Sequence, residues 1–179
     1  MAAPRDPGTY DENELETSIV RGRLDVGLLR ARAWCDDPQA MCMYADWLLH
    51  RATTEVSGEL ALDDVAEARA WLQRAVATGS RRAAGMLGDV LLDYARLPDD
   101  RRAGASLLRG AAFGGDVAAM RRLGVRCLVD GAAEQARFSG DADAERRDAA
   151  EARRWLMRAA GRGDERSAEL LASFDDLFD

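Results

Sequence analysis

The sequence predicts an all-α protein, a right-handed α/α solenoid of helix-turn-helix repeats. Alanine, the best helix former, makes up about a fifth of the 179 residues. A tryptophan-containing segment recurs along the chain, and a second, different helical pattern alternates with it. A pair of amphipathic helices that repeats in this way buries its apolar faces by stacking on the neighbouring pairs, which is how α-solenoids fold.

The clearest repeat is a segment that closes on a glycine. Residues 64–79 and 148–163 match without a gap at Asp, Ala-Glu-Ala-Arg, Trp-Leu, Arg-Ala and the final Gly. Residues 100–115 are a third copy, with Leu107 in place of the tryptophan. We expect each copy to be a helix that begins at an N-cap aspartate and ends at a glycine in the left-handed conformation. The expected N-caps are Asp64, Asp100 and Asp148.

Apolar positions within these segments recur at helical spacing. In the first copy they are Ala68, Trp71, Leu72 and Ala75, a stripe that one helix cannot bury alone. The tryptophans Trp71 and Trp155 are therefore expected in the core.

A different helix alternates with the segments that close on glycine. Residues 83–91 and 119–127 coincide position by position, residues 40–48 are a third version, and residues 167–172 are a truncated fourth. Each version carries one small residue where a neighbouring helix is expected to approach closely, because glycine inside a helix needs a packing reason. These small residues are Ala45, Gly88, Gly124 and Ala172.

The combined pattern is A-x-x-x-L-G followed by D-x-x-x-A-x-x-W-L-x-R-A-x-x-x-G, and it resembles the Sel-one-like repeat, a relative of the tetratricopeptide repeat. The resemblance covers residues 38–163, although the family's usual G-x-G-V between the helices is absent. It implies a scaffold that binds a protein or peptide and carries out no catalysis.

The repeats also predict how the chain is organised. We expect a disordered tail over 1–10, N-terminal capping helices over 11–37, three repeats over 38–164 and a C-terminal capping helix over 165–179. The repeats are expected at 38–79, 80–115 and 116–163, and the helix over 11–35 is expected to break near Gly22. Leu28, Leu29 and Trp34 fall where a preceding second helix would lie, with Asp36 at the position of its closing glycine.

Two junctions between helices are longer than the one in the middle repeat. The first repeat gains about 7 residues within 51–63, and the third gains about 12 within 131–147. We expect two loops on the same edge of the solenoid. They could frame a binding site, or they could be neutral surface loops.

The composition argues against most enzymes. All 25 basic residues are arginine, which removes any Schiff-base or P-loop lysine, and His50 is the only histidine. A face formed by Cys42, Asp46 and His50 could be a nucleophile site, but we prefer an ordinary, partly exposed polar helix face as its explanation. We predict no enzyme activity, no cofactor and no metal site.

The net charge and the cysteines indicate which kinds of partner and which cellular compartment to expect. The formal net charge of −7 disfavours nucleic acid and anionic membranes as partners. Three cysteines without a C-x-x-C predict free thiols in a reducing cytoplasm, and we expect neither a signal peptide nor a membrane span. The use of alanine and arginine without lysine fits a GC-rich bacterial genome. Residues 173–179 could be an acidic-aromatic ligand or, as we prefer, the last turn of a capping helix.

The likeness to tetratricopeptide geometry implies a partner-binding face on the leading helix of each repeat. The implied residues are Gln39, Asp46, His50, Arg82, Asp89, Asp93 and Arg121. Their mixed charge suggests a polar peptide or protein surface bound by a monomer, with a homo-oligomer left open. The alternative is a dedicated immunity or inhibitor protein that neutralises one enzyme or toxin, since an acidic protein is steered toward a basic partner.

Overall fold

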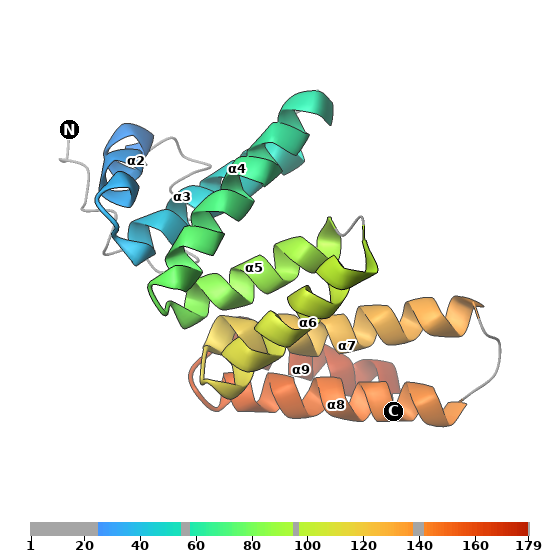
Figure 1. Cartoon of the computed structure of the whole chain (residues 1–179). Helices are drawn as coiled ribbons and strands as arrows, with labels where there is room; N and C mark the ends of the chain where they lie inside the picture. The colour runs from blue at the N-terminus through green and yellow to red at the C-terminus, as the bar shows by residue number, and fades with distance from the viewer. Residues whose placement is uncertain (1–24, 55–57, 95–96, 138–141, 179) are drawn as a thin grey trace. The chain divides into compact units, whose positions relative to one another are not determined.

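A computed structural model gives the structure of the protein and describes residues 25–54, 58–94, 97–137 and 142–178. Every regular element within these ranges is an α-helix, which confirms the predicted all-α class (Figure 1). The helices are α2 (Val26–Trp34), α3 (Pro38–Thr54), α4 (Gly58–Ala77), α5 (Arg81–Asp93), α6 (Pro98–Phe113), α7 (Val117–Arg137), α8 (Ala142–Ala160) and α9 (Glu165–Phe178).

The chain divides into two compact units, residues 1–90 and residues 91–179. In unit 1, α3 and α4 pack side by side and α2 packs against α3 (Figure 1). In unit 2, α7 and α8 form the equivalent pair, α6 packs against α7, and α9 packs against α8. Each of these packed pairs joins helices that are consecutive in the sequence, as in a helical repeat solenoid.

The predicted apolar stripe forms the core of both helix pairs. All eight of its residues in α4 and α8 are buried: Ala68, Trp71, Leu72, Ala75, Ala152, Trp155, Leu156 and Ala159. The expected close approach is confirmed at Gly124, where a Cβ atom would lie 2.9 Å from Cγ of Leu156 and 3.2 Å from the carbonyl oxygen of Ala152. The corresponding Ala172 of α9 is exposed instead.

The turn after each second helix has the same geometry four times. One residue takes a positive φ: Asp36 (60°), Gly79 (88°), Gly115 (98°) and Gly163 (90°). The next N–H donates to a carbonyl five residues earlier, from Asp37 to Arg32, Ser80 to Ala75, Asp116 to Ala111 and Asp164 to Ala159, at 3.1–3.4 Å. This is the Schellman arrangement. The predicted glycine ends are confirmed, and Asp36 takes the glycine's place in the first turn.

The N-caps lie elsewhere than predicted. Asp64 and Asp148 lie inside α4 and α8, and Asp100 lies in the first turn of α6, whose N-cap is Leu97. Side-chain caps lie instead at the leading helices, directly after each turn: Asp37 accepts from the N–H of Ala40 (3.2 Å), Ser80 from Ala83 (3.2 Å), Asp116 from Ala119 (2.7 Å) and Asp164 from Ser167 (2.9 Å). The positive-φ residue reverses the chain, so the next helix begins at once and needs its cap there.

The prediction of two loops is also wrong, because the added residues mostly lengthen the helices on either side. α3 continues to Thr54 and α4 begins at Gly58, while α7 continues to Arg137 and α8 begins at Ala142. Alanine, glutamate and arginine are strong helix formers, and they favour continuing the helices through most of 131–147. The predictions for residues 1–24 lie outside the described residues.

Candidate functional site

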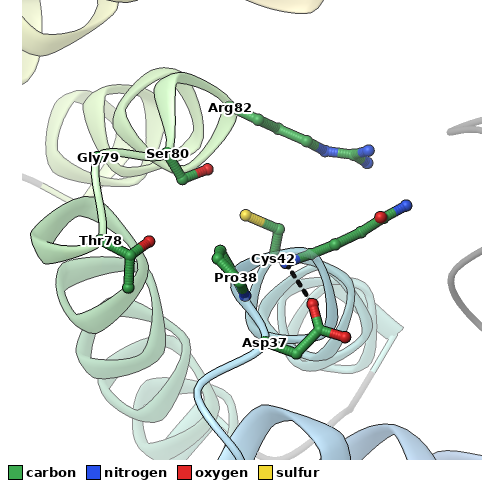
Figure 2. Close-up of a pocket in the computed structure, with 8 residues that line it drawn as sticks. Asp37, Pro38, Cys42, Thr78, Gly79, Ser80 and Arg82 are labelled. Atoms are coloured by element: carbon green, nitrogen blue, oxygen red, sulfur yellow. Dashed lines mark hydrogen bonds between the residues drawn. The ribbon is translucent and has the colours of Figure 1, made fainter.

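Two of the implied partner-binding residues, Gln39 and Arg82, line one pocket in unit 1 (Figure 2). The pocket has a volume of about 510 Å³. It lies where the start of α3 faces the turn between α4 and α5. Its lining residues are Asp37, Pro38, Gln39, Cys42, Thr78, Gly79, Ser80 and Arg82. Two successive leading helices thus begin at its walls.

Asp37 is the one carboxylate that lines the pocket, and its charge is balanced by a neighbouring arginine. Its Oδ1 accepts the N–H groups of Gln39 (3.0 Å) and Ala40 (3.2 Å), and its Oδ2 accepts Nε (3.1 Å) and Nη2 (2.6 Å) of Arg32. Burial acts to raise the pKa of Asp37, but the Ala40 N–H and the Arg32 guanidinium outweigh it and hold the pKa below its ordinary value of 3.8. Asp37 is therefore a charged helix cap and is unsuited to act as a general base at neutral pH.

The other polar groups of the pocket come from the turn and from the start of α5. Oγ of Ser80 accepts the N–H of Ala83 at 3.2 Å, so the hydroxyl proton of Ser80 is available to donate. Oγ1 of Thr78 donates to the carbonyl of Ala75 at 2.7 Å. In Figure 2, the Ser80 hydroxyl and the Cys42 thiol point into the space between the helices, and Arg82 extends over it. Cys42 is buried, and its small side chain leaves room there.

The same place in unit 2 holds a pair of oppositely charged side chains. Arg121 follows the cap Asp116 by five residues, as Cys42 follows Asp37. Nη1 of Arg121 donates to Oδ1 of Asp164 at 2.5 Å, and both side chains are 13% exposed. Asp164 stands where Ser80 stands in unit 1. Arg162, which stands where Thr78 does, places Nη1 2.9 Å from Sδ of Met120.

The remaining implied residues lie apart from the pocket lining. Asp46 and His50 lie further along α3 and Asp89 lies in α5, each half-buried. Asp93, in unit 2, forms an ion pair with Arg126 of α7. Of the seven residues, the structure therefore brings only Gln39 and Arg82 to this pocket, and it holds Asp93 and Arg121 in ion pairs.

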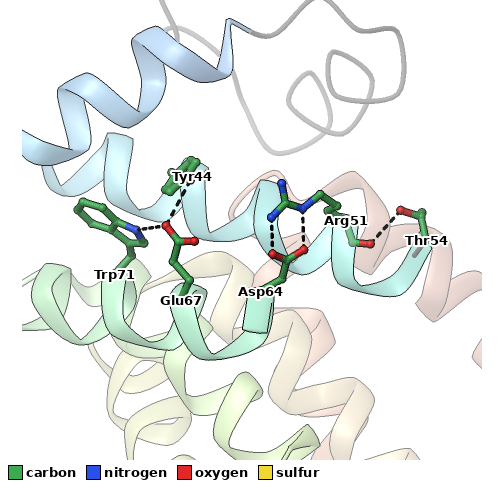
Figure 3. Close-up of polar contacts among 6 residues, drawn as sticks. All are labelled: Tyr44, Arg51, Thr54, Asp64, Glu67 and Trp71. Carbon is green, nitrogen blue, oxygen red and sulfur yellow. Dashed lines mark hydrogen bonds and ion pairs between the residues drawn. The ribbon is translucent and has the colours of Figure 1, made fainter. Parts of the chain in front are cut away.

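A polar cluster between α3 and α4 has a structural role (Figure 3). Oε1 of Glu67 accepts both the Tyr44 hydroxyl and Nε1 of Trp71, each at 3.3 Å. Burial and the Glu67 carboxylate raise the pKa of Tyr44. Further along the two helices, Arg51 pairs with the buried Asp64 through both carboxylate oxygens. The sequence prediction missed this role of Asp64, which joins the lengthened ends of α3 and α4.

Each core tryptophan also has an aromatic neighbour from the end of the preceding second helix. Trp34 lies edge-on to Trp71 with ring centroids 4.9 Å apart, and Phe113 lies edge-on to Trp155 at 5.0 Å. Trp34 and Phe113 are 60% and 72% exposed. The matching spacing of these residues before the turns was visible in the sequence, but the contact was not.

Neither a metal centre nor a membrane span is found in the parts of the chain that the structure describes. No group of three or more His, Cys, Asp or Glu side chains there could hold a metal ion. None of the helices there combines the length and the apolar composition that a bilayer crossing requires. Comparisons with protein-family models, with curated proteins and with solved structures found no match to this sequence.

Proposed function

We propose that the protein is a non-catalytic interaction module of the cytoplasm, and that it binds an extended segment of its partner at the pocket of unit 1. The observation that carries this proposal is the meeting of Gln39 and Arg82 at one open pocket between the starts of α3 and α5. The likeness to tetratricopeptide geometry implies a partner-binding role for both residues. We extend the proposal to the Sel-one-like class of repeat, which the four equivalent turns support.

The size and chemistry of the pocket suit a few side chains of a partner. Its volume of about 510 Å³ lies within the usual 300–1,000 Å³ of ligand pockets. Its walls offer hydroxyl, amide, thiol and guanidinium groups from two helices and one turn. These groups make hydrogen bonds and fix orientation, while Asp37, the one carboxylate in the lining, is engaged as a cap.

Selection from a phage-displayed library of random dodecapeptides on the immobilised full-length protein tests this proposal. Each enriched peptide is then measured by fluorescence polarisation against the parent and three variants. Arg82→Gln removes the pocket guanidinium, and Arg81→Gln is its matched control, because Arg81 neighbours Arg82 on α5 and is exposed. The third variant, Cys42→Arg with Ser80→Asp, transfers the Arg121–Asp164 pair of unit 2 into the pocket.

We expect Arg82→Gln and the filled pocket to weaken binding at least about tenfold and Arg81→Gln to leave it within about twofold. Circular dichroism spectra and melting curves confirm that each variant is folded. A library that yields no peptide, or peptides that bind the filled variant as tightly as the parent, would show that the pocket is not the binding site.

The alternative proposal, a dedicated neutraliser of one enzyme or toxin, is favoured by the net charge of −7. An acidic protein associates faster with a basic one because the opposite charges steer the encounter. A neutraliser binds one folded protein tightly and short peptides not at all. The peptide selection therefore separates the two proposals.

A further inference from the structure

We infer that the pocket of unit 1 binds a carboxylate of the partner, supplied by an aspartate or glutamate side chain or by the partner's carboxyl terminus, with Arg82 and Ser80 as its donors. This inference rests on the proposed function, because it names the chemistry that the same pocket would recognise.

The charged groups around the pocket favour an anionic ligand over a cationic one. Asp37 already accepts four hydrogen bonds, two from backbone N–H groups and two from Arg32. A carboxylate has about four lone-pair sites, so Asp37 has little capacity left for a cationic ligand. Its negative charge is also opposed by the Arg32 guanidinium at 2.6 Å. The other charged group of the lining is the guanidinium of Arg82, whose five N–H donors can bind a ligand in addition to its contact within the chain.

The hydrogen-bonding groups have the same preference. The Ser80 hydroxyl accepts from Ala83, which leaves its proton to donate, and the guanidinium of Arg82 carries donors alone. The Gln39 amide can donate as well. Hydrogen bonds from such groups to a carboxylate are stronger than those to a neutral acceptor. The starts of α3 and α5 add a positive potential that reinforces this preference.

Unit 2 shows how the same fold completes this place with an internal ion pair. There the carboxylate of Asp164 stands at the position of Ser80 and binds the guanidinium of Arg121. In unit 1 Ser80 and Cys42 stand at these two positions, so neither charge of the pair is present, and Arg82 stands where Arg166 does in unit 2. The place that the ion pair occupies in unit 2 can therefore take in unit 1 a ligand that accepts hydrogen bonds from Ser80 and Arg82.

The test uses synthetic copies of the peptides enriched in the library selection. Each is made with its acidic residues changed one at a time to the matching amide, and with either a free or an amidated C-terminus. The amide at the contacting position should weaken binding to the parent about tenfold, since one charge-assisted hydrogen-bonded pair is lost. If amidation of the C-terminus has this effect instead, the C-terminus is the source of the carboxylate.

The Arg82→Gln variant identifies the group that the carboxylate contacts. Against this variant, the acidic and amide forms of the peptide should bind with affinities within about twofold of each other. Arg82→Lys should restore part of the preference for the acidic peptide, and Arg81→Gln should leave all of it.

Each outcome decides between the two proposals. Peptides that require the pocket but bind equally well as acids and as amides would overturn the carboxylate inference and leave the proposed function standing. Enriched peptides that carry arginine or lysine in place of an acidic residue would also overturn it. A selection without pocket-dependent peptides would reject both.

Discussion

The α3–α4 pair of unit 1 and the α7–α8 pair of unit 2 share a backbone plan and differ at the start of their leading helices. Both pairs bury the Ala-Trp-Leu-Ala stripe of their second helix, and both are followed by a positive-φ glycine and a capped leading helix. At the start of the leading helices, unit 1 places Cys42 and Ser80 where unit 2 places Arg121 and Asp164. The first two side chains line a pocket, and the second two form an ion pair at the same place.

The difference shows how a repeat fold can acquire a site without a change of backbone. The turns are fixed by one positive-φ residue and one cap, and these are retained in every repeat. The residue five positions after the cap has no role in the turn, so it can vary between a small thiol and a long guanidinium. The binding site that we propose depends on the small residue at this position of α3, Cys42.

The largest expected effect tests what the two units share. Trp71→Ala and Trp155→Ala should each lower the free energy of unfolding by about 3–5 kcal/mol, because each leaves a cavity the size of an indole in the core. The measurement is urea unfolding followed by circular dichroism. Trp34→Ala is the control, since Trp34 is 60% exposed and should cost far less than either. A Trp71→Ala protein as stable as the parent would mean that the repeat register is wrong.

The next effect concerns the ion pair that distinguishes unit 2. Arg121→Met should lower the free energy of unfolding by about 2 kcal/mol, between the values for exposed and buried pairs, because Asp164 is left partly buried without its guanidinium. Arg126→Met is the matched control on the same helix, since its partner Asp93 has a side chain 55% exposed, and it should cost under about 1 kcal/mol. Equal losses would mean that the Arg121 pair adds no more than a surface contact.

The turns that both units share predict that alanine substitution has opposite effects on stability at two glycines of unit 2. A Cβ atom at Gly115 meets nothing within 4 Å, so the cost of Gly115→Ala is that of its φ of 98° alone, about 1 kcal/mol. Gly110 lies inside α6 with equally open space, and Gly110→Ala should stabilise by about 1 kcal/mol. Melting curves give both values. Changes of the same sign would show that backbone conformation does not control this turn.

Much of this framework could be predicted from the sequence, because it is local. The gap-free recurrence of Trp-Leu and of the closing glycine predicted the core of α4 and α8 and the ends of the second helices. The N-caps were misplaced because Asp64 also suits a cap by type. Only the structure shows that α4 begins six residues earlier, at Gly58, and that Asp64 pairs with Arg51.

The pocket could not be predicted, since it depends on residues that are far apart in the sequence. Gln39 and Arg82 were predicted as partner-binding residues from the implied face of the leading helices, and the structure places both at one pocket. The contribution of Thr78 and Ser80 follows from the turn, which places them opposite α3 only when the helices are packed. No local sequence pattern indicates that the space beside the small side chain of Cys42 stays open, rather than being filled by a neighbouring side chain.

The smallest expected effect lies at the carboxylate of the unit 1 pocket. The pKa of Asp37 is lower in the folded protein than its ordinary value of 3.8, so folding favours the ionised form. Its contribution to stability is therefore fully present above the unfolded pKa and is lost as the pH falls through the folded pKa.

Asp37→Asn keeps a good N-cap but removes this charge and its contact with Arg32. The variant should unfold at lower urea concentration than the parent at pH 6, by under about 1 kcal/mol, because the Arg32 pair is partly exposed. The difference should shrink as the pH falls below 3.8 and through the lower folded pKa, where the parent's Asp37 also becomes neutral. A difference that is the same at pH 6 and at pH 3 would mean that the carboxylate is not held by Arg32 and the start of α3, and the charge balance of the pocket would have to be reassigned.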